Sequence, residues 1–235
     1  LVLAPDRWQL ETIAARAGQI LSFIEANPPR RGVHWNSGQE IALRMIAWLF
    51  AQGVLWDEPA VGRVAAPLAR ALYDSALHVE EHRDYAAKAV HNNHLIAEAL
   101  AGLLGACALP SAPEAPRWWA EAMELLTAQA DIQFYEDGAY IQQSHNYQRT
   151  AMQMYLCAAH VLTAVGEPIP RAWLRALERS LDFLVAQQNP ADGRLPNFGA
   201  NDGSMPLILS TADYADFRPT LQTASLLTRG ERIYP

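Results

Sequence analysis

The sequence predicts an all-α fold, an incomplete ring of antiparallel helical hairpins. Apolar residues recur at spacings of three and four along almost the whole chain, and the period-two alternation of half-buried strands is absent. Ala and Leu are abundant, whereas Val, Ile and Thr are modest in number, and this composition favours helix over sheet. Short connections rich in Pro and Gly separate segments of helical length, and helices joined in this way pack antiparallel.

Four helices are predicted in the first half of the chain, and proline or glycine punctuates each of them. Pro28 stops the first helix because proline cannot continue the hydrogen-bond ladder, and Gly53 lies just beyond the second. Pro67 is expected to mark the true first turn of the third helix rather than its middle, and Pro110 closes the fourth. The predicted ranges are 6–26, 36–52, 61–86 and 93–107.

The second half predicts three more helices and a weaker fourth, over 115–134, 145–165, 169–188 and 212–228. Asp137-Gly138 forms a turn, and Asn189-Pro190 stops the third of these helices. Residues 191–206 are rich in Gly, Asn, Asp and Pro, which predicts a loop. We therefore expect a helical domain over 1–190, closed by a loop and a terminal helix over 191–235.

Composition limits the classes of partner. The formal net charge of −7 argues against nucleic acid, whose binders need a basic surface, but leaves room for an acidic sugar held by a local polar cluster. No apolar run approaches the roughly 20 residues of a membrane span, so membrane insertion is not expected. Cys107 and Cys157 lie in apolar helical contexts and are interpreted as free thiols. The chain does not begin with Met, so we expect a fragment of a longer protein or a processed chain.

Two segments place polar groups where helices begin. The first is His91-Asn92-Asn93-His94, directly before an apolar run. One Asn is explained as an N-cap, but two Asn flanked by two His leave functional use as an even alternative. The second is the run of hydrogen-bonding side chains over 142–149, in which Ser144 is a plausible N-cap for the helix that follows. Within it, Gln143 and Arg149 are predicted to contact substrate.

Helix N-termini offer free N–H donors and about half a positive charge, which suits an anion. If both helix starts face one cleft, Asn93 and His94 can hydrogen-bond a carboxylate and delocalise charge as the adjacent carbon loses its proton. Tyr147, close to Arg149 and a helix start, is expected to have a lowered pKa and to exchange protons with substrate. These are the parts that an elimination reaction needs.

Other patterns have simpler explanations. His78 and His82 stand at i, i+4 spacing, but no third metal ligand follows, and a polar helix face is favoured. Paired carboxylates for glycoside hydrolysis remain the main competitor, with Glu136, Asp137 and Asp202 as candidates. A non-catalytic carbohydrate-binding or scaffold module is the other alternative. The tryptophans are interpreted mainly as core, and no metal or cofactor is expected.

At these residues the sequence resembles the heparinase II/III-like polysaccharide lyases, a family of heparinases and oligoalginate lyases. Four stretches carry the likeness in the family's order. They are Trp35–Arg44 continuing to Trp48, Asn92–Glu98, Asp137–Arg149 and Pro196–Gly203. The resemblance implies an incomplete (α/α) toroid, followed in full-length relatives by a β-sandwich domain. It also implies an acidic, uronate-containing polysaccharide or oligosaccharide as substrate.

The same resemblance implies roles for individual residues. Asn93 and His94 would contact the uronate carboxylate, and Tyr147 would be the catalytic acid, with its service as the base an open alternative. His145 is a possible separate base, and Arg44 would match the family's substrate-binding arginine. The last loop departs from the Gly-Asp of relatives, and no β-rich segment precedes the end of the sequence at residue 235. We therefore expect that a C-terminal β-domain of the same protein is missing here.

Overall fold

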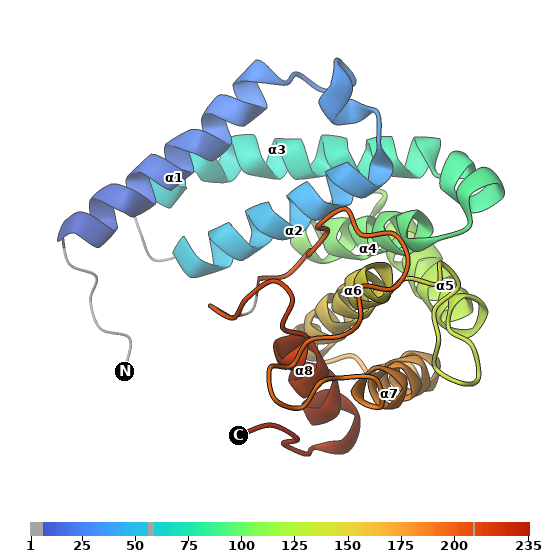
Figure 1. Ribbon diagram of the computed structural model, residues 1–235. Helices are drawn as coiled ribbons and strands as arrows, with labels where there is room; N and C mark the ends of the chain where they lie inside the picture. Colours follow the sequence, from blue (N-terminus) through green and yellow to red (C-terminus); the bar gives the residue numbers. More distant parts are fainter. Residues whose placement is uncertain (1–6, 56–58, 209) are drawn as a thin grey trace.

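The computed structural model describes residues 7–55, 59–208 and 210–235, and within them the regular secondary structure is helical (Figure 1). Extended pairing in these ranges is limited to two isolated bridges, Phe134–Tyr140 and Arg194–Asp216. The all-α prediction is confirmed. The α-helices of the described residues are α1 Arg7–Ala26, α2 Gly38–Leu55, α3 Pro59–His82, α4 Asn93–Ala108, α5 Ala115–Gln133, α6 His145–Val165, α7 Arg171–Val185 and α8 Arg218–Arg229, with a 3-10 turn at Val33–Trp35 and a π-helical turn at Ala86–Val90.

Helix α4 is the centre of the fold. It packs against α2, α3, α5 and α6, and it is buried along nearly its whole length. Its sequence explains this position, because a helix that is apolar all round has no face for solvent. Gly105 lets its neighbours approach closely, since a Cβ there would lie 2.7 Å from the Cβ of Ala76 on α3 and 3.3 Å from the Trp118 ring on α5.

The remaining helices form two groups around α4. In Figure 1, α1, α2 and α3 lie on one side of it and α5, α6, α7 and α8 on the other. Within the groups α1 and α2 pack on α3, while α7 contacts α5, α6 and α8. The arrangement is the incomplete ring of helical hairpins that the sequence predicts. It also places the starts of α4 and α6 close enough to share polar contacts.

Most predicted boundaries agree with the structure, and α6 begins and ends where the sequence placed it. The predicted start of the first helix, residue 6, lies outside the described residues. The prediction for Pro67 is wrong, because Pro67 lies inside α3 on its exposed side, where water can replace the hydrogen bond that proline lacks. The last helix starts at Arg218 instead of residue 212, because Asp213 and Asp216 each accept a backbone N–H two residues on and hold the preceding segment in turns.

The structure tests three predictions made from composition, on the cysteines, the tryptophans and the lengths of the helices. Cys107 and Cys157 are free and partly buried, as expected. Trp35, Trp48 and Trp118 are core residues, each at most 7% exposed. None of the described helices combines the length and apolarity needed to cross a membrane.

Candidate active site

The start of α4 separates the two asparagines by role. Asn92 is the N-cap, and its Oδ1 accepts a hydrogen bond of 2.9 Å from the backbone N–H of His94. Asn93 is 1% exposed, and its Nδ2 donates to Oε1 of Gln39 on α2 at 2.8 Å. The Oδ1 atom of Asn93 is buried without a partner among the described residues. Capping explains Asn92, but it does not explain the buried, partly satisfied amide of Asn93.

His91 does not join this pair. Its backbone is left-handed, with φ 49°, its side chain is exposed, and its Nε2 lies 3.0 Å from the carbonyl oxygen of Lys88. The residue ends the π-helical turn and lets the chain reverse into α4. Of the two histidines in the motif, His94 is the candidate for chemistry.

The start of α6 meets the start of α4 through a glutamine. Ser144 is the N-cap of α6 as predicted, with its Oγ 3.2 Å from the backbone nitrogen of Tyr147. Gln142, two residues earlier, accepts a hydrogen bond of 3.4 Å from the backbone N–H of Asn93. The two polar segments therefore meet at one end of the helix pair. The contact joins a backbone N–H of the α4 start to the segment that leads into α6.

A cavity of ≈ 550 Å³ opens beside the start of α4. His94 and Glu98 line it from α4, one helical turn apart, and polar and aromatic side chains complete its wall. These others are Trp35, Asn36, Ser37, His78, His82 and Tyr85. A hollow with an aromatic wall and a few polar groups suits a sugar ring, which stacks through its C–H face and bonds through its hydroxyls.

Burial acts on both titratable groups that α4 contributes to this cavity. It lowers the pKa of the His94 imidazole, so this ring is neutral at pH 7. It raises the pKa of the Glu98 carboxyl to about 7, against the smaller opposing effect of the Arg83 guanidinium. Oε2 of Glu98 is buried without a hydrogen-bond partner among the described residues. The cavity therefore holds a neutral imidazole and a carboxyl group that readily takes up a proton.

Glu98 makes the stability of the chain depend on pH. Because the folded-state pKa of about 7 lies above the reference value of 4.5, the folded state binds the proton more tightly, and stability falls as pH rises between these values. Replacing Glu98 with Gln is expected to stabilise the chain by about 1–2 kcal/mol at pH 8 and not at pH 4. Urea unfolding at both pH values measures the difference in unfolding free energy between Glu98→Gln and the parent. Glu124→Gln, at an exposed position, is the control. An equal gain in stability from Glu98→Gln at both pH values would contradict the raised pKa of Glu98.

The pKa of the Tyr147 phenol differs from the sequence-based prediction. Its hydroxyl donates a hydrogen bond of 2.9 Å to Oδ2 of Asp202, and partial burial together with this carboxylate raises the pKa of the phenol. The predicted lowering is wrong, because the guanidinium of Arg149 bonds the Tyr214 carbonyl and Asn146 instead of approaching the phenol. The phenol is therefore protonated at neutral pH. It can donate a proton, but it is poorly suited to accept one.

Tyr147, His145 and Gln143 lie at the same helix start, and none of the three lines the His94 cavity. His145 is 4% exposed, its Nδ1 lies 2.8 Å from the Pro196 carbonyl oxygen, and its ring packs near Phe183 and Phe198. Gln143 is exposed and has a left-handed backbone, with φ 49°. The tight turn before α6 explains the backbone of Gln143, and packing against the following loop explains His145.

The two predicted arginines are enclosed by aromatic rings. Arg149 is 1% exposed, with its guanidinium carbon 4.3 Å from the centroids of both Tyr214 and Phe217. Arg44 bonds the His34 carbonyl oxygen at 3.1 Å and is surrounded by Phe23, Trp35 and Trp48. It lines a smaller cavity than His94 does, although Trp35 borders both. Neither arginine lines the cavity that contains His94.

The alternative chemistries find less support in the geometry. Oδ1 of Asp137 accepts the backbone N–H of Ala139 within its own turn, Glu136 is exposed, and Asp202 is bonded to Tyr147. Asp137 and Asp202 therefore have partners of their own, and no contact in the described part of the chain joins two of these carboxylates as a hydrolytic pair. His78 and His82 stack with ring centroids 4.1 Å apart, and the described residues contain no group of three or more potential side-chain ligands placed for a metal ion.

Three residues that sequence reasoning did not single out contact Asn93 or line the His94 cavity: Gln39, Glu98 and Gln142. Each carried a weak signal. Glu98 is a lone carboxylate in an apolar helix, and burying a carboxylate without a partner costs folding free energy. Gln39 and Gln142 stand in segments noted for other residues, but their pairing with Asn93 joins positions 54 and 49 residues apart. Local patterns do not reveal such pairings.

Comparisons with known proteins agree with this architecture. The chain matches the heparinase II/III N-terminus family over residues 65–219. Among solved structures, it is similar to the heparinase III BT4657 gene product, at TM-score 0.57 and 17% identity over 79% of this chain and 33% of that one. It is equally similar to the heparan sulfate lyase HepC from Pedobacter heparinus, at TM-score 0.57 and 19% identity over 78% of this chain and 29% of that one.

The search of the curated proteins finds no significant match. The chain spans about a third of the length of the solved structures that it resembles. At these identities the structural likeness establishes the fold, the helical toroid, while the family match covers well over half of the chain. The chain belongs to the heparinase II/III N-terminus family.

Proposed function

We propose that this chain is the helical part of a polysaccharide lyase that cleaves uronic-acid-containing chains by β-elimination. The observation that carries the proposal is the meeting of two helix starts. The backbone N–H of Asn93 bonds Gln142, beside the cavity that His94 lines. Membership of the heparinase II/III N-terminus family supports it. The solved relatives bear the names heparinase III and heparan sulfate lyase, which favours an acidic polysaccharide as substrate.

The proposed mechanism begins with the carboxylate of the uronate. The amide of Asn93, with one N–H held by Gln39, and the neutral imidazole of His94 bind this group next to the positive end of α4. Their donors stabilise the charge that spreads onto the carboxylate when the C5 proton passes to a base, which the proposed β-domain would supply to the completed cleft. A lowered barrier at this carbon is the main requirement of the reaction.

The second half of the mechanism uses Tyr147. The electron pair of the broken C5–H bond forms the C4–C5 double bond and expels the glycosidic oxygen, which takes the proton of the Tyr147 hydroxyl. The raised pKa of this phenol supports the role of acid, since the proton is in place at neutral pH. His145 has no role in this proposal because it is buried in the packing of the following loop.

The proposed whole protein is larger than the present chain. Residues 1–190 would form the helical toroid, residues 191–235 would close it, and a β-domain of the same protein would complete the cleft. The short coverage of the solved relatives is consistent with such a further domain. We expect the protein to act in the periplasm or outside the cell, where acidic polysaccharides are met.

Ultraviolet absorbance tests the proposal, because elimination leaves a conjugated unsaturated uronate at the new chain end. The full-length protein is incubated with alginate, heparan sulfate and hyaluronan, and new reducing ends are measured in parallel. Enoate and reducing ends that appear together on any of these substrates support the lyase. Reducing ends without enoate would establish a hydrolase instead, and the absence of both would favour a binding module.

A further inference from the structure

A row of hydrogen bonds leads from a buried cation to the phenol of Tyr147. Arg149 is 1% exposed, and among the described residues no carboxylate lies within ion-pair distance of it. A buried charge without a counter-ion is costly unless dipoles around it compensate. One such dipole is the amide of Asn146, whose Oδ1 accepts from Nη2 of Arg149 at 3.2 Å.

Only one orientation of the Asn146 amide matches the hydrogen-bond donors and acceptors around it. Its Oδ1 faces the guanidinium of Arg149 and the hydroxyl of Tyr214, whose single proton it shares with Oδ1 of Asn201, and its Nδ2 lies 3.2 Å from Oδ1 of Asp202. Turning the amide over would set nitrogen against donors and oxygen against a carboxylate. The amide therefore links the cation on one side to the carboxylate of Asp202 on the other.

Asp202 completes the row. Its Oδ2 accepts the hydroxyl proton of Tyr147 at 2.9 Å, and its Oδ1 also accepts the backbone N–H of Ser204 at 3.0 Å. The carboxylate is thus held from three directions, by a phenol, an amide and its own turn. Such a group has little freedom to rotate, and it restricts the phenol that bonds to it.

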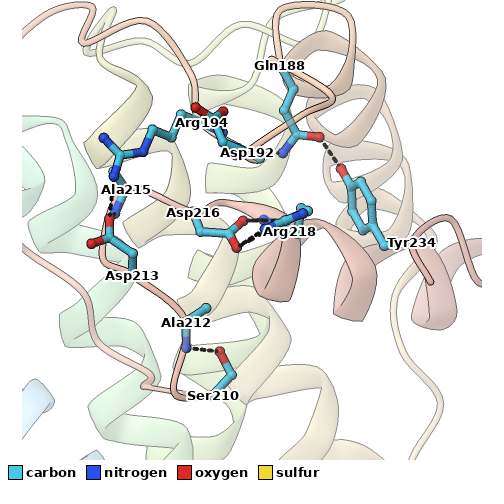
Figure 2. Close-up of polar contacts among 11 residues, drawn as sticks. Gln188, Asp192, Arg194, Ser210, Ala212, Asp213, Ala215, Asp216, Arg218 and Tyr234 are labelled. Carbon is cyan, nitrogen blue, oxygen red and sulfur yellow. Dashed lines mark hydrogen bonds and ion pairs between the residues drawn. The ribbon is translucent and has the colours of Figure 1, made fainter.

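The loop that carries Asp202 is itself fastened to the start of α6. The Ser144 hydroxyl donates to the Ala200 carbonyl oxygen, and the Tyr214 hydroxyl bonds Oδ1 of Asn201 at 2.7 Å. Gly199 packs so tightly that a Cβ there would overlap the Gln143 carbonyl oxygen. The ends of the loop are anchored as well, where Arg194 pairs with Asp213 at 3.4 Å and Asp216 pairs with Arg218 at 2.7 Å (Figure 2).

We propose that Asp202 is a positioning residue for Tyr147: its hydrogen bond fixes the phenol oxygen and keeps it protonated in the resting site, and the O–H turns from Asp202 to the leaving oxygen of the substrate when the proton is transferred. Asp202 neither gains nor loses a proton in this step. The inference rests on the proposed function for its catalytic consequence, but the hydrogen bond itself is independent of it. Partial burial raises the pKa of Tyr147, and the hydrogen bond to Asp202 and the charge of that carboxylate raise it further, which agrees with this role.

The first test needs no turnover. The 235-residue chain is labelled with 3-fluorotyrosine, and the Tyr147 signal is identified by its loss in Tyr147→Phe. In the Asp202→Asn variant this signal is expected to titrate at lower pH than in the parent, because a neutral amide no longer opposes the phenolate. The control Asp213→Asn changes a carboxylate of the same loop that pairs with Arg194 and should leave the midpoint in place. An unchanged midpoint in Asp202→Asn, or an equal shift in both variants, would overturn the inference.

The second test uses the active full-length protein. Asp202→Asn is expected to lower kcat about tenfold with KM within about twofold, since the acid is misplaced while the carboxylate contacts remain. Asp202→Glu should recover part of kcat, which a merely structural role would not predict. A kcat unchanged in Asp202→Asn would contradict the positioning role. If the parent shows no lyase turnover, the proposed function fails, and the fluorine titration alone still decides whether Asp202 holds Tyr147.

Discussion

Replacing Tyr147 with Phe is expected to lower enoate formation by about 100-fold or more, the usual contribution of a positioned acid. Phe retains the ring and its packing but lacks the hydroxyl that donates to Asp202. The leaving glycosidic oxygen would then depart as an alkoxide or take its proton from water. The measurement is the initial rate of enoate absorbance with the full-length protein, at saturating and at low substrate.

A matched control accompanies this prediction. Tyr135→Phe makes the same chemical change at a side chain that is 44% exposed and outside the site, and it should leave the rate unchanged. Thermal unfolding of both variants establishes that they are folded. The assignment of Tyr147 as the acid is wrong if Tyr147→Phe retains more than about a tenth of the parent kcat, since general acids usually contribute far more.

Gly138→Ala should cause the largest loss of stability, about 3 kcal/mol or more. Gly138 has φ 89°, a conformation that Ala adopts only with strain, and the new Cβ would overlap the backbone carbonyl oxygen of Arg179 on α7. The turn cannot move away freely, because the Gly138 carbonyl oxygen accepts from Gln148 at 2.7 Å and from Ser180 at 3.2 Å. Strain and overlap at a site fixed from two helices belong to the severe class of substitutions.

Gly166→Ala separates these two causes. Gly166 caps α6 with φ 79°, but a Cβ there meets nothing within 4 Å. It should therefore lose only about 1 kcal/mol, the cost of the left-handed backbone alone. Urea unfolding of both variants gives the comparison. Equal losses would show that the turn at Gly138 relaxes and that the overlap with Arg179 is relieved without cost.

Much of the fold could be predicted from local pattern. Helix α6 is marked by Ser144 at one end and by Gly166 at the other, and both signals act within a single turn of chain. Pro67 shows where such rules fail, because α3 already begins at Pro59 and the packing of its apolar side holds the helix together across a missing hydrogen bond. Tertiary contacts decided this position, and a single proline could not reveal them.

The site was predictable to the extent that its geometry is local. The N-caps Asn92 and Ser144 follow from residue type and position. Residue type and position did not predict the direction of the Tyr147 pKa shift, because Arg149 stands two residues later and points to another side of the helix. The partner that does act on Tyr147 is Asp202, 55 residues away on a loop. Nothing in the spacing of the sequence links these two positions.

The composition of the α4 start has a consequence for ionic strength. Asn93, Gln39 and a neutral His94 offer dipoles at this site instead of charged side chains. Binding a polyanion through lysine and arginine releases condensed counterions, and its affinity then falls steeply with added salt. A carboxylate held by amides and helix N–H groups releases few ions. The affinity of this site for an acidic sugar should therefore change little between dilute buffer and seawater-like salt.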